Sequence, residues 1–358
     1  MSARPLLELT RGSVVESVHS GCIAVADSNG TLIASYGDPH LPAFLRSSAK
    51  PFQAVPFVEA GGVKHFGLSP RELSVACASH EGSDLHVQVV AGMQQKIGID
   101  ASALQCGVHL PADVPAFKSL VANGGQPTPI RNNCSGKHTA MLAHAKMRGA
   151  PLQTYLEPSH PVQAEILACF AQLCRIAPEQ IALGTDGCSA PNFAIPLHHA
   201  ALGMARLCDP RELPEARAEA CRTITSAMTA HPEMVSGFGE FDEQLMRVGA
   251  GKIVCKRGAE GYQIVGLMPG VLGAGAPGMG IAFKVLDGDL PRMSINLSAR
   301  SRVRPAVTIE ILRQLGALTA VQQQALAAYG PAGPIKNHRG TETGETRPVF
   351  ALERAARP

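Results

Sequence analysis

Strand character concentrates late in the chain, in KIVCK (252–256), GYQIVGL (261–267) and GIAFKVLDG (280–288). These apolar runs are rich in β-branched residues and bounded by glycines, which is typical of buried strands. Matching strands occur early, where VVESVHS, CIAVAD and TLIASYG occupy most of residues 14–37 around a Ser-Asn-Gly turn at 28–30. An Asn-Gly step favours the positive φ angles of a tight hairpin. The pattern therefore predicts β structure on both sides of the middle of the chain.

Between these strands, from Ser47 to about Tyr329, the pattern is mainly helical. Ser69-Pro70-Arg71-Glu72 is a capping box, and Ser83 is placed to cap the next helix. Further helices are predicted at 136–148, 161–175, 193–207 and 213–229, and VTIEILRQL and VQQQALAAY read as two closing helices.

The element order predicts an α+β fold, in which N- and C-terminal strands form one antiparallel sheet and the helical block packs beside it. We expect a single unit over 1–330, with strands 5–37 and 252–290 in the sheet and the helical block at about 47–230. The segment 331–358 is rich in proline, glycine and charge, so we expect a loosely ordered tail.

The composition argues against a nucleic-acid-binding protein. The 358 residues carry a formal charge of only +3, and only 4% of them are aromatic. The chain therefore has little positive charge to attract phosphates and few rings to stack on bases. The uncharged stretch 262–283 contains six glycines and two prolines, so it predicts buried strands and turns rather than a membrane helix. Charges at Arg4, Glu8 and Arg11 interrupt any apolar export signal, so we expect a cytoplasmic protein whose ten cysteines are reduced.

One lysine of the ten has a serine three residues before it, in Ser47-Ser48-Ala49-Lys50. On a helix this spacing places both side chains on one face, as a serine nucleophile and a lysine base require. A lysine base must be neutral, which takes roughly 3–5 kcal/mol of unfavourable environment. Lys256, at the end of a predicted strand, is a candidate second cation beside Lys50. The following Pro51 disfavours helical backbone at the lysine.

Two polar turns carry further chemistry. IRNNCSGKHTAML (130–142) leads into a helix, with Cys134 and Lys137 again three residues apart, and LGTDGCSAPNFAIPL (183–197) holds Asp186 and Cys188. Two thiols in such turns are compatible with a soft metal such as zinc, and equally with inert buried thiols. CASHEGSD (77–84) and TAHPEMVSGFGEFD (229–242) add Ser79 and His231. A histidine beside proline is also a common turn residue.

Taken in order, RSSAKPFQA, ACASHEGSD, NNCSGKHTAML, GTDGCSAPNFAIPL, TAHPEMVSGFGEFD and KRGAEG resemble the rhizobial-type L-asparaginases, the asparaginase II family. The resemblance covers roughly residues 5–330, and its most specific parts are the two cysteine-containing motifs. The family's fold is similar to serine β-lactamases and penicillin-binding proteins, and Ser-x-x-Lys-Pro-Phe itself resembles a run of the latter. No Ser-x-Asn element occupies the middle position usual in β-lactamases, which argues against β-lactam hydrolysis.

The resemblance implies an L-asparaginase that converts L-asparagine to L-aspartate and ammonia through an acyl-enzyme. It implies that Ser47 is the nucleophile and Lys50 its base, with Ser79 and Lys256 as a second pair that transfers protons. The implied zinc ligands are Cys134, Lys137 and Cys188. The implied substrate-binding residues are Arg46, Asp186, His138 and His231. It also implies a homodimer.

Three alternatives remain open at this point. A zinc-bound hydroxide could attack with the serine secondary, the protein could be a serine acylase like the penicillin-binding proteins, or it could be a metal-binding protein without activity.

Overall fold

The computed structural model describes residues 3–288 and 303–354. Its larger sheet has nine strands in the order β10-β11-β1-β2-β9-β8-β7, with β3 pairing both β2 and β12. The bounds of these strands are β1 Arg4–Arg11, β2 Val14–Asp27, β3 Leu32–Tyr36, β7 Ile253–Arg257, β8 Tyr262–Leu267, β9 Met279–Val285, β10 Gly333–Lys336, β11 Glu342–Pro348 and β12 Glu353–Arg354. Every pairing is antiparallel, and β2 joins the two halves by pairing with β1, β3 and β9. The predicted α+β sheet of N- and C-terminal strands is therefore confirmed.

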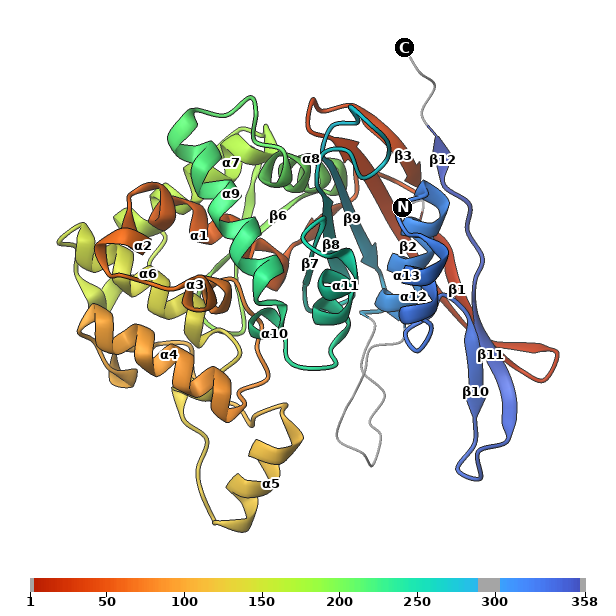
Figure 1. Cartoon of the computed structure of the whole chain (residues 1–358), viewed down its shortest axis with the longest axis horizontal. Helices are drawn as coiled ribbons and strands as arrows, with labels where there is room; N and C mark the ends of the chain where they lie inside the picture. Colours follow the sequence, from red (N-terminus) through yellow and green to blue (C-terminus); the bar gives the residue numbers. More distant parts are fainter. Residues whose placement is uncertain (1–2, 289–302, 355–358) are drawn as a thin grey trace.

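The helices surround this sheet on two sides (Figure 1). The helical block begins after a 3-10 turn at Arg46–Ala49 and comprises α1 Lys50–Glu59, α2 Gly62–His65, α3 Pro70–Ala76, α4 Asp84–Ile97, α5 Val114–Ala122, α6 Ser135–Met147, α7 Pro161–Cys174, α8 Leu197–Cys208 and α9 Glu215–Ala230. Four further helices follow, α10 Pro232–Val235, α11 Phe241–Gly249, α12 Val303–Leu315 and α13 Ala320–Ala325. Helix α8 packs against β2, β8 and β9, whereas α12 contacts β1, β8 and β11.

Both predicted helix caps form. The Ser69 hydroxyl accepts from the Glu72 amide while the Glu72 carboxylate accepts from the Ser69 amide, and Ser83 caps α4 in the same way through the His86 amide. Each cap satisfies amides that the first helical turn leaves unpaired. Helix α3 ends directly before the loop that carries Ser79, so its start is one of the features that position the site.

A smaller three-stranded sheet corrects one helix prediction. Residues 193–196, predicted as the start of a helix, belong to β6 (Pro191–Pro196), which pairs with β4 (Pro42–Phe44) and β5 (Ala182–Thr185). The apolar run PNFAIP is too short for its periodicity to separate strand from helix. This strand matters for the site, because its partner β4 runs directly into the turn that holds Ser47.

The segment after residue 330 also differs from the expectation. The predicted loose tail instead contributes β10, β11 and β12, and β11 pairs with β1 over Leu7–Leu9. Its polar composition suits strands at the margin of an antiparallel sheet, where one face can lie in water and little apolar surface is buried.

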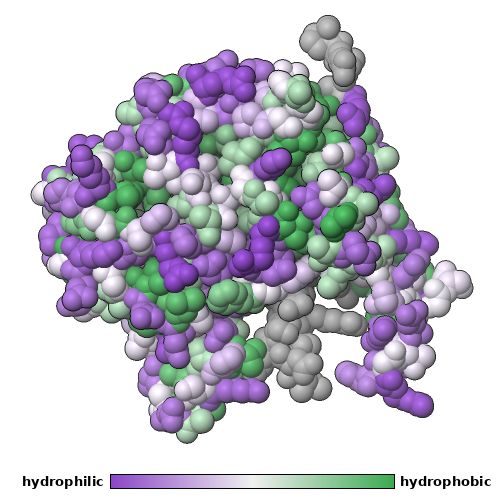
Figure 2. Space-filling model, in the orientation of Figure 1, coloured by the Kyte–Doolittle hydropathy of each residue, from purple (hydrophilic) through white to green (hydrophobic). Residues whose placement is uncertain are grey.

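The surface in Figure 2 intersperses hydrophilic and hydrophobic residues. Within residues 3–288 and 303–354, no helix is both long and apolar enough to cross a membrane. The uncharged stretch 262–283 forms β8, a glycine-rich connection and most of β9, as predicted.

Candidate active site

Ser47 and Lys50 lie where β4 gives way to α1. Residues Arg46–Ala49 form a 3-10 turn, in which side chains three apart are aligned one above the other. Lys50 opens α1 with helical backbone angles, although the following Pro51 was expected to disfavour them. Pro51 itself is tolerated because it stands in the first turn, where its missing N–H costs no helical hydrogen bond. Ser47 is partly exposed, whereas Lys50 is only 1% exposed. A reachable hydroxyl thus adjoins a buried amine.

A second serine lies between two buried lysines. The Ser79 hydroxyl is 3.0 Å from Lys50 Nζ and 2.9 Å from Lys256 Nζ. Lys50 also donates to the carbonyls of Ala78 and Asn133, and Lys256 donates to the Arg257 carbonyl at 3.0 Å. We call Lys50, Ser79 and Lys256 the lysine–serine centre. Its two amines, from α1 and β7, share one neutral hydroxyl.

Burial, and then the positive charge of Lys50, lower the pKa of Lys256 well below its ordinary value. The prediction placed Lys256 beside Lys50 as a second cation, and the two lysines do meet, through Ser79. An amine with a lowered pKa exchanges protons readily near neutral pH. Since a hydroxyl both donates and accepts, Ser79 can accept from Lys50 while it donates to a neutral Lys256.

No hydrogen bond joins Ser47 to Lys50 within the described ranges, although the sequence spacing led us to expect one. The Lys50 amine is directed instead to Ala78, Ser79 and Asn133. Catalytic hydrogen bonds are often long in the free enzyme and shorten when substrate binds.

β7 passes close to the turn that holds Ser47. The Ser48 hydroxyl donates to the Lys256 carbonyl at 2.9 Å. A Cβ on Gly258 would lie 2.5 Å from the Leu45 carbonyl oxygen. The glycine that follows Lys256 in the KRG motif is therefore required by this close approach.

Two thiols and an amine form a second group of buried polar side chains. Lys137 Nζ lies 3.0 Å from Cys188 Sγ, and the Cys134 thiol, which is also 3.0 Å from Asn133 Oδ1, is hydrogen-bonded to Cys188. That hydrogen bond, with Lys137 as a further cause, lowers the pKa of Cys188 far below its ordinary value. The same hydrogen bond and burial raise the pKa of Cys134.

Lys137 completes this group as a cation. Burial acts to lower the pKa of Lys137, but the negative charge at Cys188, and then that at Cys134, outweigh burial and raise it. We call Cys134, Lys137 and Cys188 the thiol–amine group.

The donor set of the thiol–amine group is suited to zinc. Two thiolates and one amine are soft-to-borderline ligands of the kind Zn²⁺ prefers. The described part of the chain contains no group of three His, Cys, Asp or Glu residues placed to hold a metal, so any such site must use Lys137. The neighbouring His138 is held by Tyr155, with Nδ1 2.6 Å from the hydroxyl, and its buried ring also interacts with Cys188 and helps to lower the pKa of that thiol. The residues present therefore fit the expected metal.

Arg46 and Asp186 form an ion pair beside Ser47. Arg46 Nε lies 2.8 Å from Asp186 Oδ1, which also accepts from the Gly187 amide at 2.7 Å. Asp186 and Cys188 both lie on the connection between β5 and β6, as their shared motif indicates. This connection brings the ion pair and one thiol of the thiol–amine group to the same part of the molecule.

His231 does not join these residues. It ends α9, its imidazole lies 3.5 Å from Glu233, and its carbonyl accepts from Ser74. Within the described ranges, none of its polar contacts reaches Ser47 or the lysine–serine centre. Sequence reasoning missed the carbonyls of Ala78 and Asn133, because main-chain acceptors leave no signature in residue type.

The chain matches the L-asparaginase II family over residues 7–348. It belongs to this family. It is accordingly an amidohydrolase. No curated protein matches the chain significantly.

Solved structures similar to this family member include glutaminases. A probable glutaminase from Bacillus subtilis, complexed with 6-diazo-5-oxo-L-norleucine, has a TM-score of 0.38 and 12% identity, covering 83% of this chain and 84% of that one. A Bacillus glutaminase in 4.3 M NaCl has a TM-score of 0.39 and 10% identity, covering 83% and 91%.

Proposed function

We propose that the protein is an L-asparaginase that hydrolyses the side-chain amide of L-asparagine to L-aspartate and ammonia. The observation that supports this most strongly is the lysine–serine centre, in which the Ser79 hydroxyl lies between two buried amines. One of them belongs to Lys50, three residues after Ser47. Such a centre can move protons at neutral pH, as amide hydrolysis requires twice in each cycle.

In the proposed reaction, Lys50 first passes its proton through Ser79 to Lys256 and is then neutral. The Ser47 hydroxyl attacks the side-chain amide carbon and Lys50 takes its proton. Ser79, which contacts both amines, passes a proton to the amide nitrogen as Lys256 returns one to Ser79, and the C–N bond breaks to release ammonia. After the same transfer has made Lys50 neutral again, water attacks the ester on Ser47 and gives a proton to Lys50. Lys50 passes this proton to the Ser47 oxygen as the ester bond breaks, and L-aspartate leaves. The Arg46–Asp186 pair and His138 lie beside these groups and are proposed to bind the charged ends of the substrate.

Cys134, Lys137 and Cys188 would hold Zn²⁺. When bound, the metal would position and polarise a substrate oxygen. Two thiolates already balance its charge, so it would be a weak activator of water, and Ser47 remains the proposed nucleophile.

The proposal is tested by ammonia release from asparagine and glutamine side by side. Ser47→Ala should lower kcat by about 10³-fold or more, while Ser119→Ala, an exposed serine, leaves it unchanged. The reagent 6-diazo-5-oxo-L-norleucine should add one label to the wild type and none to Ser47→Ala, as seen by mass spectrometry. Activity of Ser47→Ala within a few-fold of wild type would sink the serine mechanism and favour attack by a zinc-bound hydroxide.

The metal is tested separately, by zinc content. The purified wild type should retain about one zinc ion per chain, and Cys188→Ser should retain little. Cys221→Ser, which removes a buried cysteine outside the thiol–amine group, is the control. Equal zinc in all three proteins would contradict the proposed ligands.

The expected homodimer and cytoplasmic location stay predictions. Light scattering on the purified chain measures the first directly.

A further inference from the structure

Arg46, the residue before Ser47, has left-handed backbone. Its φ is 52°, a region that costs a residue with a Cβ about 1–2 kcal/mol. Such strain persists only where the surroundings hold it, and it is most often found at functional sites. A glycine would adopt this conformation freely, but it would lose the guanidinium that pairs with Asp186. The question is therefore what holds Arg46 in place.

β6 holds this turn through two successive contacts. The ladder between β4 and β6 continues past Phe44, since the Leu45 amide donates to the Phe193 carbonyl at 3.0 Å. At Arg46 the chain turns out of the ladder, and its amide donates instead to Oδ1 of Asn192 at 3.0 Å. A side-chain oxygen thus replaces the main-chain acceptor where the strand ends.

Asn192 is itself fixed. It is only 4% exposed and lies within β6, whose pairing with β5 sets its backbone. In residues 3–288 and 303–354, no hydrogen bond is made by its amide nitrogen, so the only protein contact of the side chain's polar atoms is the one to Arg46. Buried polar side chains are normally hydrogen-bonded. The hydrogen bond to Arg46, a strained residue beside the proposed nucleophile, therefore accounts for a buried asparagine at this position.

We propose that Asn192 is a positioning residue. Its Oδ1 holds Arg46 in the left-handed conformation, and this directs the Ser47 hydroxyl toward the substrate. The inference rests on the proposed function, in which Ser47 is the nucleophile. It concerns neither zinc binding nor proton transfer at Ser79.

The test is a double-mutant cycle on the full-length, zinc-loaded enzyme. Asn192→Leu removes the acceptor and should lower kcat about 5–30-fold, the factor that corresponds to the 1–2 kcal/mol cost of the turn, with KM changed less than threefold. Asn192→Asp keeps the acceptor and should retain kcat within about threefold. In an Arg46→Gly background, where glycine tolerates the turn, Asn192→Leu should lower kcat further by less than about threefold.

Three readouts separate this role from a general loss of structure. Zinc content and melting temperature should stay the same in Asn192→Leu, and the rate of labelling by 6-diazo-5-oxo-L-norleucine should fall in parallel with kcat. An equal loss from Asn192→Leu in both backgrounds, or no loss in the first, would overturn the proposal. These outcomes are distinct from failure of the serine mechanism, which appears as an active Ser47→Ala enzyme.

Discussion

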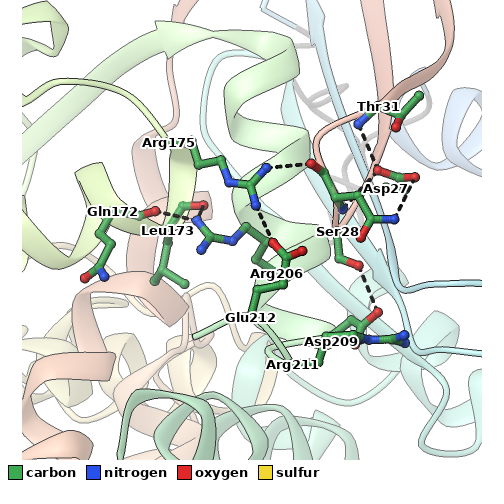
Figure 3. Close-up of polar contacts among 11 residues, drawn as sticks. Asp27, Ser28, Thr31, Gln172, Leu173, Arg175, Arg206, Asp209, Arg211 and Glu212 are labelled. Carbon is green, nitrogen blue, oxygen red and sulfur yellow. Dashed lines mark hydrogen bonds and ion pairs between the residues drawn. The ribbon is translucent and has the colours of Figure 1, made fainter. Parts of the chain in front are cut away.

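Two clusters of charged side chains in this molecule are built in opposite ways. The hairpin cluster, formed by Asp27, Ser28, Arg175, Arg206, Asp209, Arg211 and Glu212, surrounds the β2–β3 turn and the end of α7 (Figure 3). There each charge has a counter-charge or a set of main-chain partners. In the lysine–serine centre, no carboxylate lies within ion-pair distance of either amine among the described residues, and their direct partners are neutral.

Asp209 and Arg206 show the matched arrangement. Asp209 accepts from the Ser28 hydroxyl and the Gly278 amide, both at 2.8 Å, and from Arg211 at 2.7 Å. Arg206 donates to the carbonyls of the last turn of α7. Matched charge connects elements, whereas burial, and then the unmatched charge of Lys50, lower the pKa of Lys256. The comparison indicates that the fold accepts unmatched charge at the proposed catalytic centre.

The largest expected effect is on catalysis at the unmatched cluster. Lys256→Met should lower kcat by about 10³-fold, because Ser79 loses one of its two proton partners. The free energy of unfolding should stay the same or increase, since the change replaces a buried amine by an apolar group of similar length. Ammonia release and urea denaturation measure the two effects. Lys252→Met, on an exposed side chain four residues earlier, is the matched control, and a kcat within fivefold of wild type contradicts the assigned role.

A substitution in the hairpin cluster should affect stability and leave catalysis nearly unchanged. Asp209→Ala leaves a buried hydroxyl and a buried amide without their acceptor, and it should lower the free energy of unfolding by about 3 kcal/mol. kcat of the folded fraction should change less than twofold. Glu212→Ala breaks an exposed ion pair and should cost under about 1 kcal/mol. If Asp209→Ala abolished turnover without loss of stability, the division between the clusters would be wrong.

A third comparison concerns pH at the border of the lysine–serine centre. Burial, and then the nearby Glu240 carboxylate, raise the pKa of Glu81 to about 8, although Arg257 opposes this. The folded chain therefore keeps a proton on Glu81 that the unfolded chain releases above about pH 4. Stability from this proton is complete at low pH and is lost as pH rises toward 8.

Glu81→Gln should remove this pH dependence. The variant should be more stable than wild type by on the order of 2 kcal/mol at pH 9 and nearly equal to it at pH 5. Urea midpoints at both pH values measure the difference, with Glu157→Gln, on an exposed carboxylate, as the control. A pH slope that the substitution leaves intact would show that another group titrates.

The smallest effect is expected at Arg206. Arg206→Met removes two hydrogen bonds to the end of α7, but it also removes a buried cation whose pKa burial lowers. The two contributions oppose each other, so we expect a loss of only about 1 kcal/mol in the free energy of unfolding. A loss as large as that of Asp209→Ala would show that Arg206 is a principal connection of the hairpin cluster.

Local signals in the sequence predicted much of the fold. The capping box at Ser69 and the cap at Ser83 form as predicted, because a cap depends on residues within one turn of each other. The strand at 193–196 and the edge strands after residue 332 were not predicted. Their strand character is decided by partners far away in the chain, which local propensity does not record.

The candidate site shows the same division. Two local patterns pointed to residues that the fold does bring near one another. They are the spacing of Ser47 and Lys50 and the motif around Asp186 and Cys188. The role of Asn192 was not visible, since it depends on a left-handed turn 146 residues away in the sequence. The family resemblance implied that Ser79 pairs with Lys256, whereas its contact with Lys50 was not predicted and depends on tertiary structure.

The antiparallel pairing of β2 with β9 has a consequence for synthesis. β2 is complete about 250 residues before β9 emerges, and at 5–20 residues per second the delay is about 10–50 s. Until then, one edge of β2 has no partner, although Cys22, Ile23, Ala24, Val25 and Ala26 are apolar and buried in the finished sheet. We expect ribosome-bound chains that stop before β9 to be sensitive to protease and prone to associate through β2, and chains that include β9 to be protected. Pulse proteolysis of stalled nascent chains measures the difference.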